Sequence, residues 1–286
     1  MTRLAVIGPG LLGGSIALAA RRAGNFRVAV WARRPDAVQE LRDKEVADFA
    51  SDDLRAVAEG ADLAVLCVPI GVMPRLAAQL AEFLPPGALV TDVGSVKAPV
   101  VEALSPIFQG GARFIGSHPM AGSEQAGLSA ARADLFDGAT CIVTPEVDSA
   151  AADVATVSCF WETLGCRVVN LDPAAHDEMV ARISHFPHLL AAVLVRSVDE
   201  DCAAAFEFIG PGFRDTTRVA AGPPAMWTEI LQTNRVAVKK SAEAMIEKLH
   251  EALRLLDESP GDDTLMNQFL TEAKIRRDSL KKPTKQ

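Results

Sequence analysis

The sequence lacks a surplus of basic residues, a cysteine motif and a long uninterrupted apolar run. Its 286 residues include 29 Lys and Arg against 37 Asp and Glu, which gives a net charge of −8. Because contacts to nucleic acid phosphates require surplus positive charge, this balance argues against nucleic acid as a partner. The 5 cysteines are odd in number and show no CxxC spacing, which disfavours disulfide frameworks and zinc ribbons and favours the reducing cytoplasm. No run of about 18 apolar residues is free of charges and helix breakers, so we expect no membrane-spanning segment.

Short apolar runs alternate with amphipathic segments up to about residue 170. The runs are rich in Val and Ile, are bounded by Gly, Pro or Asp, and comprise residues 4–8, 27–31, 63–68, 88–93, 113–117, 140–144 and 166–171. They are typical of strands buried on both faces. The segments between them, such as 72–84, repeat apolar residues every three or four positions and predict helices. The alternation predicts an α/β domain of the Rossmann type over residues 1–171, with a doubly wound, mostly parallel sheet.

Strand signals stop beyond this point, and we predict an all-α domain over residues 172–286. Two helical segments, 176–198 and 224–258, dominate it. The second is expected to be one helix of about 35 residues, or ~50 Å. Its apolar stripe has nearly heptad spacing and comprises Val238, Ala242, Met245, Leu249, Leu253 and Leu256. The stripe favours a homodimer interface, with packing inside the chain's own core as the alternative.

The stretch LAVIGPGLLGGSIALAA at residues 4–20 has two interpretations. Arg3, followed by an apolar run that ends in small residues, is typical of a secretory leader. Four glycines and a proline within residues 8–14 would break the helix of such a leader. Gly8, Gly10 and Gly13 instead form a GxGxxG between a predicted strand and a predicted helix, where a pyrophosphate would rest on helix N–H groups. We therefore predict a dinucleotide site.

The end of the second predicted strand bears on the choice between NAD and NADP. About 20 residues after the glycine motif, such sites usually supply an acidic residue for the ribose 2′-hydroxyl. Here the strand ends in Ala32, Arg33 and Arg34, and paired arginines suit a 2′-phosphate. We therefore favour NADP+ over NAD+, with two merely solvated arginines as the alternative. The predicted cofactor-binding residues are Gly8, Gly10, Leu11, Leu12, Gly13, Arg33, Arg34, Val68, Pro69 and Ser95.

Three polar stretches supply candidate catalytic residues. Ser95, where a strand turns into a helix, is either an N-cap or a hydroxyl facing the ligand edge of the sheet. His118, held between glycines and a proline just past a strand, is a candidate general base. His185 and His188 lie three apart, but no second cluster completes a metal site, so no metal is predicted. Arg218 either pairs with a structural carboxylate or grips an anionic substrate in a bidentate fork.

Taken together, these motifs resemble the prephenate/arogenate dehydrogenase family from about residue 3 to 260. GPGLLGGS, TDVGSVK, GSHPMAGSE, ISHFPH and FRDTTR occur in the family's order. The resemblance implies oxidative decarboxylation of prephenate to 4-hydroxyphenylpyruvate in tyrosine biosynthesis, with hydride transfer to NAD(P)+. An arogenate or dual-specificity cyclohexadienyl dehydrogenase is the alternative. The resemblance also implies a homodimer formed through the helical domain.

The resemblance further implies roles for single residues. His118 would be the catalytic base, and Ser95 would orient it and touch the cofactor. Arg218 would hold a substrate carboxylate. The other substrate-binding candidates are His185 or His188 beside the substrate side chain, Glu124 near the mouth of the site, and Arg214. Many family members carry an acidic residue where this chain has Ala32, so their preference for NAD is not expected here.

Two more remote interpretations remain. A β-hydroxyacid dehydrogenase also has a Rossmann domain followed by long helices, and Lys239 or Lys240 would then be its catalytic lysine. That interpretation leaves the HPMAG and FRDTTR stretches unexplained. An NADP-sensing dimeric regulator would account for the glycine motif and the apolar stripe, but it gives His118 no role.

Overall fold

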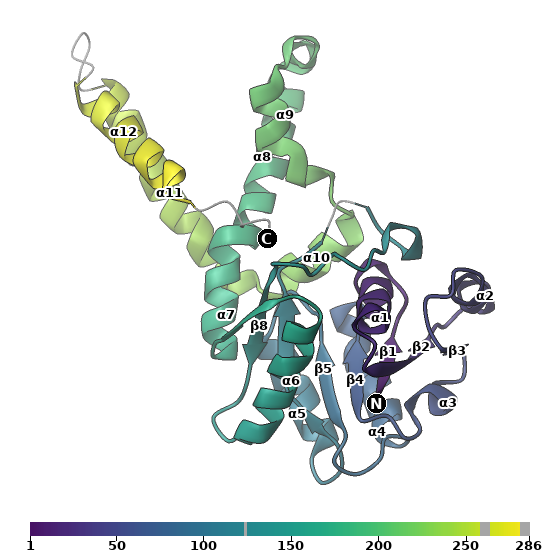
Figure 1. The fold of residues 1–286 in the computed structure, drawn as a ribbon. Coiled ribbons are helices and arrows are strands. Elements are labelled where there is room, and N and C mark those ends of the chain that lie inside the picture. The colour runs from purple at the N-terminus through teal and green to yellow at the C-terminus, as the bar shows by residue number, and fades with distance from the viewer. Residues whose placement is uncertain (123–124, 258–263, 281–286) are drawn as a thin grey trace.

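The computed structural model describes residues 1–122, 125–257 and 264–280. An N-terminal α/β part carries a helical C-terminal part, whose helices project as two arms (Figure 1). The main sheet is entirely parallel, in the order β3-β2-β1-β4-β5-β6. Its strands are β1 (Thr2–Ile7), β2 (Phe26–Trp31), β3 (Phe49–Ser51), β4 (Leu63–Leu66), β5 (Leu89–Asp92) and β6 (Arg113–Phe114). The predicted parallel sheet is confirmed, although the three-residue strand β3 gave no sequence signal.

A second sheet contains β7 (Gly116–Pro119), β8 (Thr140–Thr144) and β9 (Arg167–Asn170). β7 runs antiparallel to β8, whereas β9 is parallel to it. The prediction of one strand over 113–117 is therefore wrong, because the chain leaves the main sheet at Ile115 and enters the second sheet. Gly116 permits the crossing, since a Cβ there would lie 2.5 Å from the Thr144 hydroxyl. The crossing leaves His118 on a short strand beside the carboxyl end of β5.

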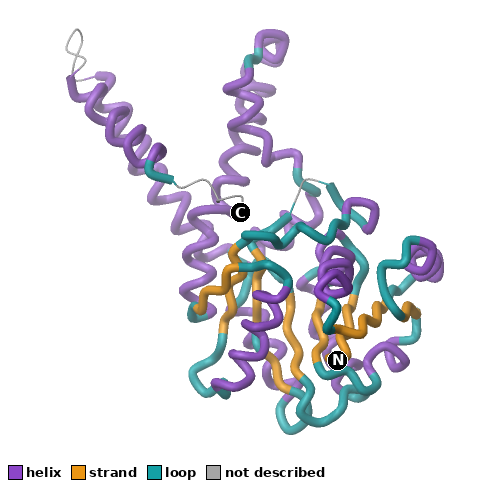
Figure 2. Tube along the Cα trace, in the orientation of Figure 1, coloured by secondary structure: helices purple, strands orange, loops and turns teal. Residues whose placement is uncertain are grey.

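Helices cover both faces of the main sheet (Figure 2). Apolar residues of α1, α2 and α6 form one core layer, and those of α3, α4 and α5 form the other. The helices of this part are α1 (Leu11–Ala23), α2 (Pro35–Asp43), α3 (Leu54–Ala58), η1 (Ile70–Val72), α4 (Met73–Ala81), α5 (Ala98–Phe108), η2 (Leu128–Ala130) and α6 (Ala151–Thr163). Two covered faces explain why the central strands are apolar throughout.

The C-terminal part is helical, as predicted. Its elements are α7 (Pro173–Val180), the π-helical turn η3 (Ala181–His185), α8 (Phe186–Cys202), η4 (Ala203–Phe208), α9 (Pro211–Thr217), η5 (Arg218–Ala221), α10 (Pro224–Thr233), α11 (Arg235–Asp257) and α12 (Thr264–Asp278). The prediction of a single helix over 224–258 is wrong, because the chain leaves helical geometry at Asn234 (φ −100°, ψ 25°). The Asn234 side chain is buried and hydrogen-bonded there, and these contacts fix the break between α10 and α11.

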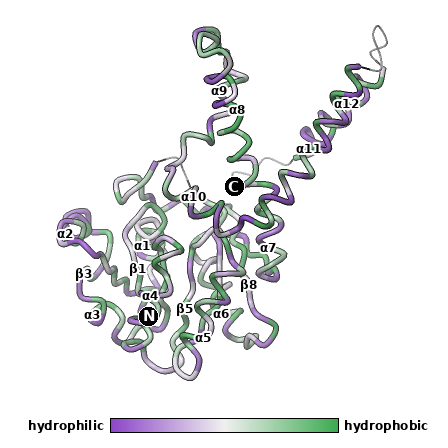
Figure 3. The backbone as a smooth tube through the Cα atoms, turned by 180° about the vertical axis from the view of Figure 1, so that it is seen from behind, coloured by the Kyte–Doolittle hydropathy of each residue, from purple (hydrophilic) through white to green (hydrophobic). Residues whose placement is uncertain are grey.

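A π-helical turn interrupts the long helix that begins the C-terminal part. Pro187 lacks an N–H and in a regular helix would crowd the Ile183 carbonyl, so a widened turn before it relieves the conflict. By length and composition, Pro173–Glu200 would suffice to cross a bilayer, although we expected no such segment. His176, Asp177 and His185 along it are buried, so this side of the helix packs inside the protein. Apolar residues recur along the projecting α8 and α11 (Figure 3).

Candidate active site

The turn after β1 leaves room for a ligand to approach the backbone. Gly8 has φ +112°, and a Cβ there would lie 2.5 Å from the Cys67 carbonyl oxygen. A Cβ on Gly13 would lie 1.9 Å from the Gly8 carbonyl oxygen, so glycine is required for close packing of α1. A Cβ on Gly10 would meet nothing within 4 Å, which leaves open space at the N-terminus of α1. These residues fit the pyrophosphate of a dinucleotide.

A cavity of about 800 Å³ lies beside this turn. Its volume is within the range of small-molecule sites, roughly 300–1,000 Å³. The predicted cofactor residues that line it are Gly8, Gly10, Arg33, Arg34, Val68 and Pro69. Leu11, Leu12, Gly13 and Ser95 are not part of the described lining, and both leucines pack against the hydrophobic core. The tertiary structure thus brings the glycine turn, the arginine pair and the end of β4 to one cavity.

The end of β2 carries positive charge to this cavity. Ala32 is fully buried, and its N–H donates to the Ser51 carbonyl at 3.1 Å. Arg33 and Arg34 are exposed beside it, with Arg34 Nε 3.6 Å from the Asp36 carboxylate. Glu40 also lines the cavity, but its carboxylate pairs with Lys44 at 2.7 Å.

Glu229 on α10 connects the helical part to the same cavity. Its carboxylate accepts hydrogen bonds from the Gly71 N–H at 2.6 Å and the Ile70 N–H at 3.1 Å. Both N–H groups belong to η1, directly after β4. No sequence pattern indicated this contact, because the two segments lie about 160 positions apart.

A buried charged cluster fixes the strand that carries His118. Lys97 and Asp92 are both fully buried and form an ion pair. The Lys97 ammonium also donates to the Ser117 carbonyl at 2.9 Å, and Asp92 accepts from the Ser117 N–H at 3.1 Å. The cluster joins the turn after β5 to β7. It therefore sets the position of His118, the next residue of β7.

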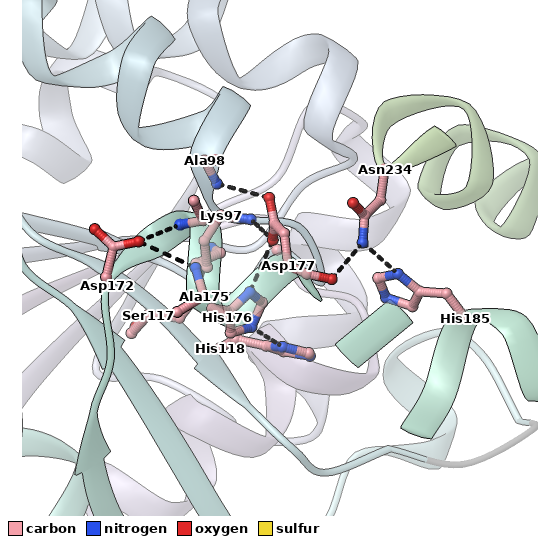
Figure 4. A network of polar contacts seen from close by, with 12 residues as sticks. Lys97, Ala98, Ser117, His118, Asp172, Ala175, His176, Asp177, His185 and Asn234 are labelled. Atoms are coloured by element: carbon pink, nitrogen blue, oxygen red, sulfur yellow. Dashed lines mark hydrogen bonds and ion pairs between the residues drawn. The ribbon is translucent and has the colours of Figure 1, made fainter. Parts of the chain in front are cut away.

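His118 is 7% exposed and belongs to a chain of buried polar side chains (Figure 4). Its Nδ1 lies 2.9 Å from Nε2 of His176, and Nδ1 of His176 lies 2.8 Å from the Asp177 carboxylate. Neither α7 residue was predicted as a site residue from the sequence. Their only signal was a His followed by an Asp early in a predicted helix, which is too common to be diagnostic.

Asp177 also caps α5 across the junction between the two parts. Its two carboxylate oxygens accept from the N–H groups of Lys97 at 2.7 Å and Ala98 at 2.9 Å. The possible N-cap role of Ser95 is therefore wrong, because Lys97 occupies the N-cap position and Asp177 supplies the hydrogen bonds. Ser95 is half-buried in the turn just before this helix.

His185 lies at the end of the π-helical turn and is 1% exposed. Its Nδ1 is 3.1 Å from the side-chain nitrogen of Asn234, and its Nε2 has no hydrogen-bond partner of good geometry among the described residues. Burial lowers the pKa of His185 to about 4. Burial, followed by the neighbouring His176, Lys97 and His185, lowers the pKa of His118 well below its usual value. Both rings are therefore neutral at pH 7.

His188 lies one turn further along and stacks on Trp227, with ring centroids 3.6 Å apart. Gly222 packs directly against this stacked pair, since a Cβ there would lie 2.3 Å from Trp227 Nε1. Arg218 begins η5, which packs against α8 and ends beside this stack, whereas Arg214 lies on α9. Both arginines are exposed in the single chain. Glu124, the remaining predicted site residue, lies outside the described residues.

Comparisons with known proteins follow this division of the chain. The family model "Prephenate dehydrogenase, nucleotide-binding domain" matches residues 16–170, and "Prephenate dehydrogenase, dimerization domain" matches residues 172–271. A prephenate dehydrogenase of Lactococcus lactis is 32% identical over 98% of this chain and 78% of its own length. A cyclohexadienyl dehydrogenase of Zymomonas mobilis is 31% identical over 96% of this chain and 94% of its own.

A solved structure agrees with these sequence matches. The prephenate dehydrogenase of A. aeolicus, in complex with hydroxyphenyl propionate and NAD+, superposes with a TM-score of 0.91 at 28% identity. The match covers 98% of this chain and 99% of that one. Two family models that together span most of the chain, and relatives above 30% identity over nearly its full length, leave one conclusion. The chain belongs to the prephenate dehydrogenase family of nicotinamide-dependent oxidoreductases.

Proposed function

We propose that this protein oxidatively decarboxylates prephenate to 4-hydroxyphenylpyruvate in cytoplasmic tyrosine biosynthesis. The observation that carries the proposal is a buried, neutral His118 whose Nδ1 is committed to His176, in a chain that also has a cavity suited to a dinucleotide. The names of the relatives support this substrate class.

In this reaction the protein has to position the substrate and remove one proton. Prephenate carries a carboxylate and a 4-hydroxyl on a cyclohexadiene ring. A bound nicotinamide cofactor would accept the hydride, held by the Gly8–Gly13 turn and the arginine pair. His118 takes the proton of the hydroxyl group, and Arg218 holds a substrate carboxylate. Loss of CO2 leaves an aromatic ring, so positioning and proton removal are what remains for these residues to supply.

Arogenate is the alternative substrate, because it differs only by an ammonium in place of the side-chain keto group. The cyclohexadienyl dehydrogenase among the relatives keeps this alternative open. His185 and His188 are the candidates for contact with that side chain. Steady-state turnover of prephenate and arogenate, each with NAD+ and NADP+, distinguishes the activities. Replacing His118 with Asn should lower kcat about 10²–10⁴-fold with cofactor affinity unchanged. No turnover of either substrate by the wild type would contradict the proposal.

We also propose that two copies associate through the helical part. Of the stripe on α11, Val238 is buried within the chain, whereas Leu249, Leu253 and Leu256 are 52%, 55% and 64% exposed. Apolar residues on a projecting helix call for a partner surface. Met245→Asp with Leu249→Asp should give a monomer in sedimentation, since unpaired buried charges are costly. A soluble, active dimer of this variant would contradict the proposed interface.

A further inference from the structure

We infer that Asp177 and His176 fix the tautomer of His118, so that its Nδ1 carries the proton and its Nε2 the lone pair. This makes His176 and Asp177 positioning residues. The inference rests on the proposed role of His118 as base, but the protonation pattern itself follows from the contacts (Figure 4).

Asp177 is held as a hydrogen-bond acceptor. Its carboxylate accepts from two backbone N–H groups, those of Lys97 at 2.7 Å and Ala98 at 2.9 Å. Both can only donate, so they hold Asp177 as an ionised acceptor. The third contact, with Nδ1 of His176 at 2.8 Å, then requires that this nitrogen carries a proton.

The pattern passes from one ring to the next. In a neutral imidazole one nitrogen donates and the other accepts, so His176 accepts at Nε2. His118 Nδ1 lies 2.9 Å from that acceptor and must donate to it. The second nitrogen of His118, Nε2, is left unprotonated. The orientation of the base is therefore set from outside β7, by the first helix of the C-terminal part.

The surroundings keep both rings neutral before reaction. His176 is fully buried, and burial is the main cause that lowers its pKa, with the Asp177 hydrogen bond acting in the opposite direction. The Lys97 ammonium disfavours a second positive charge on either ring. The pair formed by Lys97 and Asp92 lies on the β5–α5 side, and His185 lies on the α8 side.

The same chain stabilises the charge that forms in the reaction. When His118 Nε2 receives the hydroxyl proton, the ring becomes an imidazolium and its Nδ1–H donates more strongly to His176. The proton stays on His118, and the negative charge of Asp177 compensates the new positive charge through one intervening ring. A hydrogen bond to a charged group contributes more than one between neutral groups.

Nitrogen NMR of the wild type tests the tautomer without any substrate. The chain has 5 histidines, so selective 15N-histidine labelling and single His→Gln variants assign every ring. We expect His118 and His176 to be protonated at Nδ1 at pH 7.5. A wild-type His118 protonated at Nε2 would overturn the inference, whatever the enzyme's substrate proves to be.

Asp177→Asn tests the consequence for catalysis. Oδ1 of Asp177 contacts both the Lys97 N–H and His176 Nδ1, whereas Oδ2 accepts from the Ala98 N–H. In either orientation Asn therefore removes the negative charge and turns its amide nitrogen toward one N–H of α5. We expect kcat to fall about 10²–10⁴-fold with an unchanged KM for the cofactor, because the charge that compensates the His118 imidazolium is lost. The His118 proton moves to Nε2 in the NMR spectrum only where the amide nitrogen takes the place of Oδ1.

Asp172→Asn is the matched control. Asp172 caps α7 by accepting from the N–H groups of Ala174 at 2.9 Å and Ala175 at 3.0 Å, outside the chain to His118. Asn caps helices equally well, so this variant should keep wild-type kcat and tautomers. If Asp177→Asn does not fold, His176→Phe removes the acceptor of His118 and should also lower kcat selectively. Wild-type kcat in a folded Asp177→Asn or His176→Phe variant would overturn the inference.

Discussion

The side-chain nitrogen of Asn234 donates to the Asp177 carbonyl oxygen at 2.9 Å and lies 3.1 Å from Nδ1 of His185. A carbonyl oxygen only accepts, so the amide nitrogen, not its oxygen, faces both groups. His185 Nδ1 is therefore an acceptor, and its proton lies on Nε2. The break between α10 and α11 thus leaves His185 Nε2 as a hydrogen-bond donor, whereas Nε2 of His118 is inferred to be an acceptor.

Asn234→Leu should destabilise the protein by about 1–3 kcal/mol, because it leaves the buried His185 Nδ1 without a donor and removes one of two hydrogen bonds to the Asp177 carbonyl. The free energy of unfolding in urea measures this loss. Asn25 precedes β2 and is exposed, so Asn25→Leu is the control and should change stability by less than about 0.5 kcal/mol. Equal stability of the two variants would show that the Asn234 contacts do not hold the junction.

Stability should also fall in mild acid because of the buried histidines. Burial lowers the pKa of His118, His176, His185 and His188 in the native state. As the pH falls below about 6.5, the unfolded chain gains protons that the native chain does not, so native stability decreases until the native pKa is reached. For His185, with a native pKa of about 4, the loss by pH 5 is about 2 kcal/mol. Urea unfolding at pH 7 and pH 5 measures it, and His185→Asn should lose less between these values than the wild type.

Arg218→Ala should cost about 2–5 kcal/mol in kcat/KM for prephenate, because a substrate carboxylate is left without its partner. Most of the loss should appear as a raised KM, since the contact already exists in the ground state. Arg167→Ala is the control, because it removes an exposed guanidinium from β9, a strand that contributes no predicted site residue. An unmoved KM for prephenate in Arg218→Ala would assign this arginine a structural role.

We propose that the cofactor preference follows from the end of β2. Charge-assisted hydrogen bonds from Arg33 and Arg34 should favour NADP+ by about 10–100-fold, or ~1.4–2.7 kcal/mol, after screening at an exposed site. Ala32→Asp with Arg33→Ala should reverse the preference, because the new carboxylate repels the 2′-phosphate and can bind the ribose. The measurement is kcat/KM for both cofactors at fixed ionic strength. A wild type that prefers NAD+ would show that these arginines are solvated surface residues.

The sequence by itself determined the fold class and the cofactor turn. Alternating apolar runs and helical periodicity are local signals, and GxGxxG acts through the backbone of a single turn, so both can be read along the chain. The same holds for the family motifs around His118, His185 and Arg218.

Only the tertiary structure decided how the base is held. The residues that hold it lie on α7 (His176 and Asp177) and at the α10–α11 break (Asn234). Their roles depend on hydrogen bonds between residues 49–80 positions apart. Tertiary contacts also divide residues 113–119 between two sheets and break the predicted 35-residue helix. In both places, hydrogen bonds between buried polar groups outweigh the local preference for one strand or one helix. These features depend on contacts between side chains that are far apart in the sequence, and local sequence patterns do not predict such contacts.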